Sequence, residues 1–190
     1  MMLRKSEKDS AERTSSIIKE GKIVIIPTDT VYGFSGIVSR EESEFSTEKI
    51  IRKIKGRGED KPFIELLSEP ESIYNYTDHI LPQEIFGRWP GPLTVIVENN
   101  ARYKKITGRD TTAFRCPNDE WLRKVIMLCG SPIYSTSTNR SGERALNSVA
   151  EIRAEFESEV ELIVSDGDKA GVKPSAIVSF LGGKLKTIRE

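Results

Sequence analysis

KIVIIPTDTVYG, residues 22–33, joins a short apolar run to a cluster of polar side chains. Residues 22–26 predict a buried β-strand, because β-branched runs of this length are typical of sheet interiors. Residues 27–33 then place hydroxyls, a carboxylate and a phenol at the turn where that strand ends. Donors at such a turn can face a ligand, although Asp and Thr side chains also stabilise ordinary turns. From the residues alone the two interpretations are equally supported.

Helices and strands interleave on both sides of this segment. Hydrophobic periodicity and capping residues predict helices over residues 10–20, 47–55, 69–74, 82–88, 120–129 and 148–156. Apolar and β-branched runs predict strands over residues 22–26, 34–38, 63–67, 93–97, 112–115, 133–136, 161–164, 176–180 and 184–188, with a polar loop over residues 101–110. A glycine turn at 182–183 requires antiparallel pairing of the last two strands, and strict strand–helix alternation is lacking. We therefore predict an α/β domain with a mixed sheet.

Length and composition indicate a globular protein. The chain has 190 residues, of which 37% are hydrophobic and 31% charged, and we predict a single domain over residues 1–190. Its first residues lack the apolar centre of a signal peptide, and residues 1–9 are predicted to form a flexible N-terminal segment. The apolar runs are too short to span a membrane. We expect a cytoplasmic protein with no membrane contact.

Charge and residue usage exclude several kinds of site. Lys plus Arg and Asp plus Glu number 29 each, so the formal net charge is zero and any anion site must be local. The single histidine, His79, follows a polar stretch, so a Ser-His-Asp or histidine-metal mechanism is not expected. Cys116 and Cys129 are too few and too far apart for a zinc site or a disulfide framework. No metal-ligating residues are predicted.

A basic cluster lies at the C-terminal end of the helix predicted over residues 47–55. In KGRGEDKP, residues 55–62, Lys55, Arg57 and Lys61 surround two glycines. Three cations at a helix end can converge on a polyphosphate, and an arginine can chelate its oxygens. Cations there also complement the helix dipole and are commonly solvated. The chain has neither a Walker loop nor a GxGxxG loop, so a nucleotide would bind by another architecture.

Three further segments carry chemistry-bearing side chains. RWPGPLT, residues 88–94, predicts a rigid loop that either approaches another group closely or simply packs its tryptophan. In TTAFRCP, residues 111–117, Arg115 lies in an apolar run and requires a carboxylate partner from the protein or from a ligand. STSTNRSG, residues 135–142, supplies short hydrogen-bonding groups directly after a strand.

Taken in this order, these segments resemble the YrdC/Sua5 family of threonylcarbamoyl-adenylate synthases, over nearly the whole chain and in its short, single-domain form. PTDTVYG and WPGPLT stand as they do in the family, residues 55–62 fit its KxRxxxKP pattern, and Ser137 with Asn139 fits its SxN element. The chain departs from the family pattern at Gly58, Thr136, Thr138 and Ala176.

The resemblance implies a fold and a reaction. The fold would be a twisted, largely antiparallel mixed sheet flanked by helices around a basic cavity. The reaction would make threonylcarbamoyl-AMP and pyrophosphate from L-threonine, bicarbonate or CO₂, and ATP. Family members pass this adenylate to a separate transferase complex for the t6A37 modification of tRNA, so the resemblance implies that complex as a partner, together with a weak tRNA contact. Mg²⁺ is implied as a cofactor held through the ATP phosphates.

The resemblance also implies roles for individual residues. Lys55 and Arg57 would be the catalytic residues. Implied threonine-binding residues are Thr30, Tyr32, Lys61, Arg115, Ser137 and Ser175. Implied ATP-binding residues are Lys55, Arg57, Thr111, Asn139, Asn147 and Arg189.

Two other functions remain open. A non-catalytic RNA-binding module of the same fold would use the basic residues of segment 101–110, although zero net charge weighs against it. A paralogue forming another carbamoyl-adenylate, like the YrdC-like part of hydrogenase-maturation carbamoyltransferases, would use carbamoyl phosphate.

Overall fold

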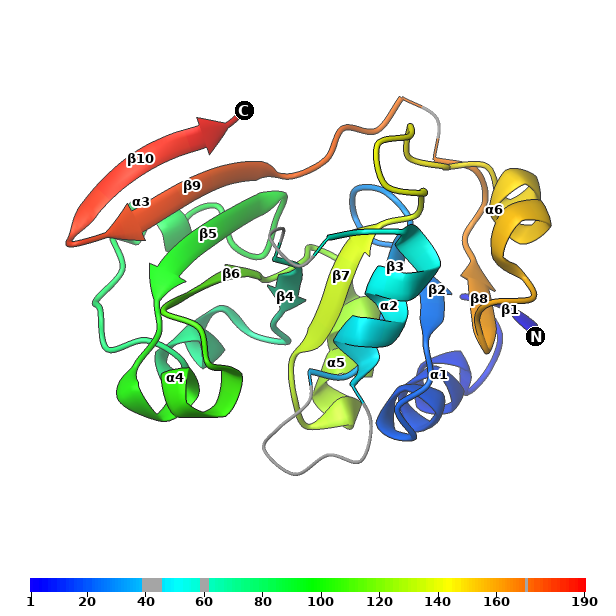
Figure 1. Ribbon diagram of the computed structural model, residues 1–190, viewed down its shortest axis with the longest axis horizontal. Helices are drawn as coiled ribbons and strands as arrows, with labels where there is room; N and C mark the ends of the chain where they lie inside the picture. The colour runs from blue at the N-terminus through cyan, green and yellow to red at the C-terminus, as the bar shows by residue number, and fades with distance from the viewer. Residues whose placement is uncertain (39–45, 59–61, 170) are drawn as a thin grey trace.

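The structure is a computed structural model that describes residues 1–38, 46–58, 62–169 and 171–190. One long sheet runs across the molecule (Figure 1), with its strands in the order β1-β8-β2-β3-β7-β4-β6-β5-β9-β10. The strands are β1 (Met2–Arg4), β2 (Val24–Ile26), β3 (Gly33–Ser35), β4 (Ile64–Leu66), β5 (Leu93–Glu98), β6 (Thr111–Arg115), β7 (Ile133–Ser137), β8 (Leu162–Ser165), β9 (Ala176–Leu181) and β10 (Lys184–Arg189). The helices are α1 (Ser10–Lys19), α2 (Thr47–Lys55), α3 (Gln83–Phe86), α4 (Ala101–Thr107), α5 (Glu120–Cys129) and α6 (Val149–Phe156), with a 3₁₀ turn η1 (Pro70–Asn75).

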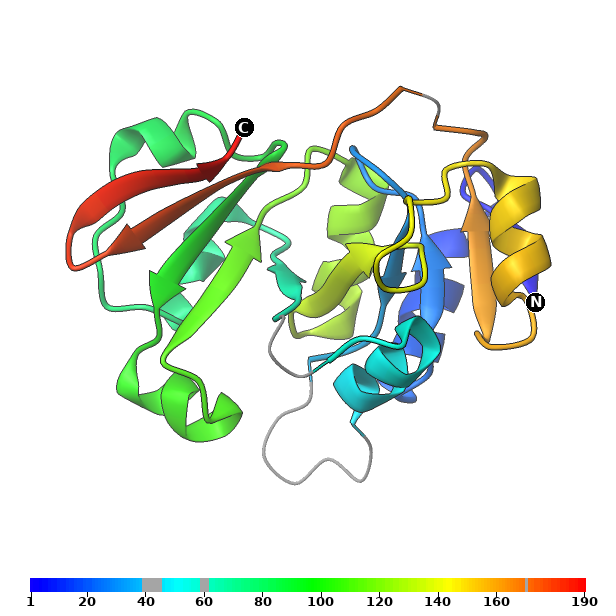
Figure 2. The same ribbon diagram turned by 45° about the horizontal axis from the view of Figure 1, so that its top comes forward.

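The predicted mixed sheet is confirmed. Among the described strands, β2–β3, β3–β7, β4–β7, β5–β6 and β9–β10 pair antiparallel. The pairs β1–β8, β2–β8, β4–β6 and β5–β9 are parallel. The C-terminal hairpin forms as predicted and projects from one end of the molecule (Figure 2). β7 pairs with β3 on one side and with β4 on the other, so it joins the two halves of the sheet.

The apolar residues 23–26 are buried on both faces of the sheet. Val24 and Ile26 pack with α1 and α5, whereas Ile23 and Ile25 pack with α2 and α6. This alternation follows from the two-residue period of a strand, and an all-apolar strand requires a helix layer on each side. Figure 1 accordingly shows α2 in front of β7 and α5 behind it. A third cluster, which includes Trp89 and Phe114, fills the other half beneath β5, β6 and β9.

Three expectations from the sequence were wrong. Residues 1–9 were expected to be flexible, but Met2–Arg4 pairs in parallel with β8, a partner about 160 residues away that local sequence cannot reveal. Segment 101–110 was expected to be a loop, yet α4 begins after Asn100, whose side chain accepts a hydrogen bond from Tyr103 N–H at 2.8 Å. Ser10 was expected to cap α1, but the cap is Asp9, in a left-handed conformation. No helix within the described residues is long and apolar enough to cross a membrane.

A buried polar network spans the two halves of the sheet. Glu65 of β4 is fully buried and accepts a hydrogen bond from Tyr103 of α4. Arg109 pairs with Glu48 of α2 and lies 3.8 Å from the second oxygen of Glu65. Glu48 also binds Arg52 at 2.7 Å. The network therefore links α2 to β4 and to the segment between β5 and β6.

Burial makes this network sensitive to pH. It raises the pKa of Glu65 to about 7, from an ordinary value of 4.5. Between these two values the folded chain binds a proton that the unfolded chain has released, so the stability that this group contributes falls as pH rises through the window.

We expect Glu65→Gln to flatten this pH dependence. Glutamine still accepts from Tyr103 and carries no ionisable proton, so the variant should gain about 3 kcal/mol relative to the parent between pH 4.5 and pH 8. Urea unfolding at the two pH values measures the difference. Glu84→Gln, at an exposed position of α3, makes the same chemical change and should leave the slope intact. Parallel stability curves for Glu65→Gln and the parent would contradict the assignment.

Candidate functional site

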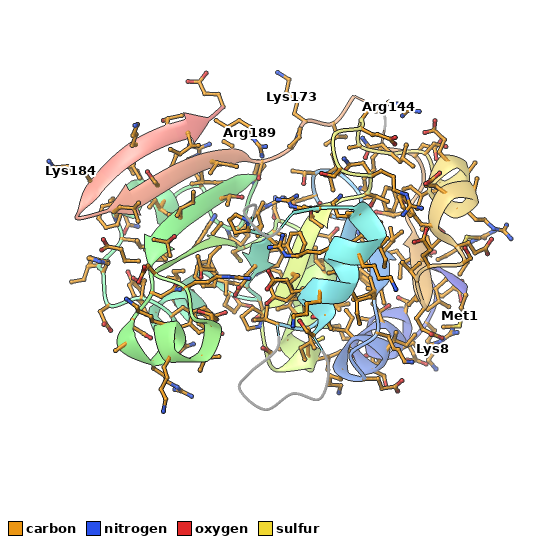
Figure 3. The ribbon with its side chains drawn as sticks, in the orientation of Figure 1. Met1, Lys8, Arg144, Lys173, Lys184 and Arg189 are labelled. Carbon is orange, nitrogen blue, oxygen red and sulfur yellow. The ribbon has the colours of Figure 1, made fainter. Side chains whose placement is uncertain are left out.

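A cavity of about 260 Å³ lies where the two halves of the sheet meet. Its walls come from the turn after β2, the segment after α2, strand β7 and the residues around β9 and β10. Figure 3 shows Arg189 at the end of β10, close to the start of β9. The polar and charged lining residues are Thr28, Thr30, Tyr32, Arg57, Arg115, Ser135, Thr136, Ser137, Ser175 and Arg189.

Arg115, at the end of β6, forms an ion pair with a carboxylate, as its burial requires. It is 4% exposed and pairs with Asp29 in the turn after β2. Asp29 also accepts a hydrogen bond from the Asn118 N–H at 2.9 Å. Burial lowers the pKa of Arg115, and the charge of Asp29 opposes that shift. The partner that the sequence left open is therefore a carboxylate of the protein.

The WPGP segment accepts a hydrogen bond from the Arg115 guanidinium. The Gly91 carbonyl accepts from Arg115 Nε at 3.2 Å, and the Gly91 N–H donates to the Cys116 carbonyl at 2.8 Å. A Cβ at position 91 would lie 2.3 Å from the Arg88 carbonyl oxygen, so only glycine fits. Trp89 is buried and donates through Nε1 to the Leu93 carbonyl at 2.6 Å. The segment both packs its tryptophan and approaches Arg115.

The hydroxyls after β2 form an ordered chain. Thr28 Oγ1 donates to the Val31 carbonyl at 2.8 Å and lies 2.9 Å from Thr30 Oγ1. Arg115 Nη1 donates to Thr30 Oγ1 at 2.9 Å. The Tyr32 hydroxyl donates to the Gly167 carbonyl at 2.7 Å, so its ring walls the cavity while its polar end is bound elsewhere.

Arg57 enters the cavity from the segment after α2. Its guanidinium lies 5.0 Å from the centroid of the Phe63 ring and donates to Thr136 Oγ1 at 3.3 Å and to the Pro62 carbonyl at 3.0 Å. Thr136 is one of the departures from the family pattern, and here it orients Arg57.

The far wall is built from the ends of the last two strands. Arg189 donates through Nη2 to the Ser175 carbonyl at 2.7 Å. Ser175 is 2% exposed, and its hydroxyl lies 2.8 Å from Thr94 Oγ1 on the neighbouring strand β5. Thr94 belongs to the WPGPLT motif but was not assigned a role, and its contact with Ser175 shows how that motif reaches this wall.

Lys55 and Asn139 lie behind the lining. Lys55 is 2% exposed, and Nζ donates to the main chain of Ser137 and to Asn139. Burial and the nearby charge of Arg57 lower the pKa of Lys55 to about 7. Both residues are thus close to the cavity, but their polar groups point into the protein.

Two remaining candidates, Thr111 and Asn147, are not among the described lining residues, and the third lies outside the described part of the chain. Thr111 begins β6 and Arg115 ends it, so the two lie about 13 Å apart at 3.3 Å per residue. Asn147 binds Lys169 N–H through its carbonyl, and its buried side-chain oxygen has no partner among the described residues. Lys61 lies outside the described residues.

Several residues in or next to the lining had no role in the sequence interpretation. Thr28 and Asp29 belong to the PTDTVYG turn, and the requirement that Arg115 be paired is the signal that could have selected Asp29. Ser135 packs closely against Gly33, where a Cβ would lie 3.1 Å from Ser135 Oγ. That glycine in the VYG segment is the only hint that β3 and β7 approach so closely here.

Comparison with known proteins gives consistent results. The Sua5/YciO/YrdC family, described as telomere recombination, matches residues 16–190. A putative threonylcarbamoyl-AMP synthase of Methanocaldococcus jannaschii is 32% identical, with 91% of this chain and 81% of that protein covered. The threonylcarbamoyl-AMP synthase of Escherichia coli K12 is 28% identical, with 94% and 95% covered.

Solved structures agree on the fold. The crystal structure of Pyrococcus abyssi Sua5 complexed with L-threonine has a TM-score of 0.79 at 30% identity and covers 94% of this chain. The chain spans about half of that protein, 53% of its length. The predicted resemblance is confirmed, and this chain belongs to the Sua5/YciO/YrdC family.

Proposed function

We propose that this chain is an L-threonylcarbamoyladenylate synthase, a nucleotidyltransferase that makes threonylcarbamoyl-AMP and pyrophosphate from L-threonine, bicarbonate or CO₂, and ATP. The observation that carries the proposal is one cavity that combines a buried arginine among short hydroxyls with two further arginines. The names of the M. jannaschii and E. coli relatives support the reaction.

The hydroxyl side of the cavity suits an amino acid. Thr30, Ser137 and Ser175 line it together with Arg115. Three N–H groups of Arg115 serve Gly91, Thr30 and Asp29, and a guanidinium has five. The two remaining N–H groups, one on Nη1 and one on Nη2, can serve a ligand carboxylate. Arginine favours bidentate contacts with such a group. The Sua5 protein crystallised with L-threonine supports placing the amino acid here.

The other side suits a polyphosphate. Arg57 and Arg189 both line the cavity. Arg189 donates to the Ser175 carbonyl, a neutral oxygen that does not cancel its positive charge, and Arg57 donates to Thr136 Oγ1 and to the Pro62 carbonyl. Arg57 is held against Phe63, so little ordering is needed when it binds phosphate oxygens. We assign ATP to Arg57 and Arg189, while Lys61, Thr111 and Asn147 stay predictions.

The chemistry needs positioning more than a protein nucleophile. The neutral threonine amine adds to CO₂ and releases one N–H proton to solvent, which gives a carbamate. A carbamate oxygen then attacks the α-phosphorus while pyrophosphate leaves. Two bound reactants held in line reduce the entropic barrier, and fixed cations stabilise the charge that develops on the phosphates.

Mg²⁺ is the further component that ATP chemistry implies. No group of three or more acidic, histidine or cysteine residues that could hold a metal is found among the described residues. The carboxylate of Asp29 is committed to Arg115 and Asn118. The described part of the chain therefore offers no ready cage, and we propose that Mg²⁺ enters on the ATP phosphates with its remaining waters.

The proposed product indicates which partner would receive it. A threonylcarbamoyl-adenylate serves tRNA modification, so we propose a cytoplasmic location and a downstream transferase complex as the recipient. A direct role as an RNA-binding module is less well supported, because Lys104 pairs with Asp110 and Arg109 with Glu48. Part of the positive charge expected to meet RNA is thus already neutralised.

Purified chain should release pyrophosphate from ATP only when L-threonine and bicarbonate are both present. Each component is needed because the carbamate is the attacking group. A coupled pyrophosphate assay with each substrate omitted in turn measures this. Tight RNA binding without threonine-dependent turnover would favour the binding module, and turnover with carbamoyl phosphate in place of threonine would favour the paralogue.

Arg57→Ala should lower kcat/KM for ATP by about 100-fold, the loss typical of removing one donor to a developing charge. The melting temperature should fall by less than about 4 °C, since the Arg57 side chain is only half-buried. Lys53→Ala, at an exposed position on the preceding helix α2, is the matched control and should leave both quantities unchanged. If Arg57→Ala unfolds the domain, Arg57 is structural and the assignment fails.

A further inference from the structure

The ammonium group of Lys55 is fully used inside the protein. Nζ donates to the Ser137 carbonyl, to the Asn139 carbonyl at 2.7 Å and to Asn139 Oδ1 at 3.0 Å. An ammonium group has three donors, so none is left for a phosphate. A cation that is 2% exposed and bound in this way cannot reach ATP without breaking these contacts.

The side chain of Asn139 is used just as fully. Oδ1 accepts from Lys55 and from Ser137 Oγ, the latter at 2.6 Å. Nδ2 donates to the Arg140 carbonyl at 2.7 Å and to the Glu143 carbonyl at 2.9 Å. A flipped amide would turn its NH₂ toward an ammonium group and its oxygen toward two carbonyls, so the orientation is determined by its neighbours.

This arrangement decides which way the Ser137 hydroxyl points. Asn139 Oδ1 can only accept, so the Ser137 proton lies between the two oxygens. Ser137 lines the cavity, and its Oγ is left with acceptor lone pairs once its proton is given to Asn139. Through Asn139, Lys55 therefore sets Ser137 as an acceptor toward a ligand.

The Thr30 hydroxyl also presents an acceptor, and the reason is independent of Ser137. The Thr28 hydroxyl proton goes to the Val31 carbonyl, so the proton shared with Thr30 belongs to Thr30. Arg115 donates to one lone pair of Thr30 Oγ1 and leaves another. The cavity thus contains two hydroxyls, Ser137 and Thr30, that present acceptors.

We propose that Lys55 and Asn139 are positioning residues, which hold Ser137 as an acceptor for the substrate amine and do not contact ATP. The inference rests on the proposed function. A neutral α-amine has two N–H bonds and one lone pair, so two acceptors can engage both N–H bonds and leave the lone pair free to attack CO₂. This reverses the ATP-binding role that the family resemblance implied for both residues.

The loop that carries Ser137 and Asn139 has other attachments to α2. The Ser141 N–H donates to the Lys55 carbonyl at 2.7 Å, and Arg140 donates to the Ile54 carbonyl. Arg140 also binds Glu155 and Glu159. Removing only the Lys55 ammonium leaves these contacts, so the loop should stay in place.

The test compares KM for threonine with KM for ATP in Lys55→Met, which keeps the unbranched stem and removes the three donors. We expect KM for threonine to rise about tenfold, the loss typical of one hydrogen bond, and KM for ATP to stay within about twofold. Lys53→Met, exposed on the same helix, is the control. Adding Ser137→Ala to Lys55→Met should raise KM for threonine no further than Ser137→Ala does alone.

The outcomes separate the possibilities. A tenfold rise in KM for ATP with KM for threonine unchanged would make Lys55 a phosphate ligand and overturn the inference, as would independent effects in the double variant. If Lys55→Met does not fold, Asn139→Ala with Lys55 intact must show the same selective loss. Parent protein that binds ATP but shows no threonine-dependent turnover would instead overturn the proposed function, and this inference with it.

Discussion

The buried ion pair between Arg115 and Asp29 is the interaction on which the site depends. Arg115 closes β6 in one half of the sheet, and Asp29 belongs to the turn after β2 in the other half. Because removing one partner of a buried pair leaves an uncompensated charge and costs about 3–5 kcal/mol, the pair holds the two halves in a fixed relation. The Gly91 carbonyl and Thr30 hydroxyl complete the shell around the guanidinium. Three segments that are distant in sequence thereby meet at one side chain.

A second buried network works alongside this pair at another level of the sheet. Glu48, Arg109 and Glu65 link α2 to the half that carries β4. The same helix ends at Lys55 and leads to Arg57 in the cavity wall. The position of Arg57 therefore depends on how α2 is held against the sheet, and Glu48 near the start of that helix shares in holding it. Stability and site geometry are coupled through one helix.

The sequence predicted those features that local chemistry determines. The bounds of α2 and α5 were predicted correctly, and Ser46 and Asp119 accept capping hydrogen bonds while Gly56 and Gly130 end the helices with positive φ. What failed depends on long-range pairing or on a weak pattern. β1 forms only because β8 offers an edge. α4 buries little besides Tyr103, so its apolar period is faint, and only Asn100 and Gly108 mark its ends.

The same distinction applies to the site. The ordered motifs predicted which segments meet, and Thr30, Tyr32, Arg57, Arg115, Ser137, Ser175 and Arg189 do line one cavity. The role of Lys55 could not be read from sequence, because a cation in a KxR pattern looks the same whether its donors face a phosphate or a carbonyl. Only the three oxygens around Nζ reveal that this charge is sequestered.

Because Arg115 is paired with Asp29, positive charge is unevenly distributed over the walls of the cavity. Among the described lining residues, Arg115 pairs with the carboxylate of Asp29, whereas Arg189 donates to the Ser175 carbonyl, which is a neutral oxygen. An amino acid is a zwitterion and fits best where the local charge is balanced, whereas a polyphosphate is drawn to excess positive charge. If Asp29 were absent, the hydroxyl side would also attract phosphate, and the two substrates would compete for one place. In the substrate assignment that we propose, the ion pair that joins the two halves of the sheet also keeps the amino-acid side from becoming a second phosphate site.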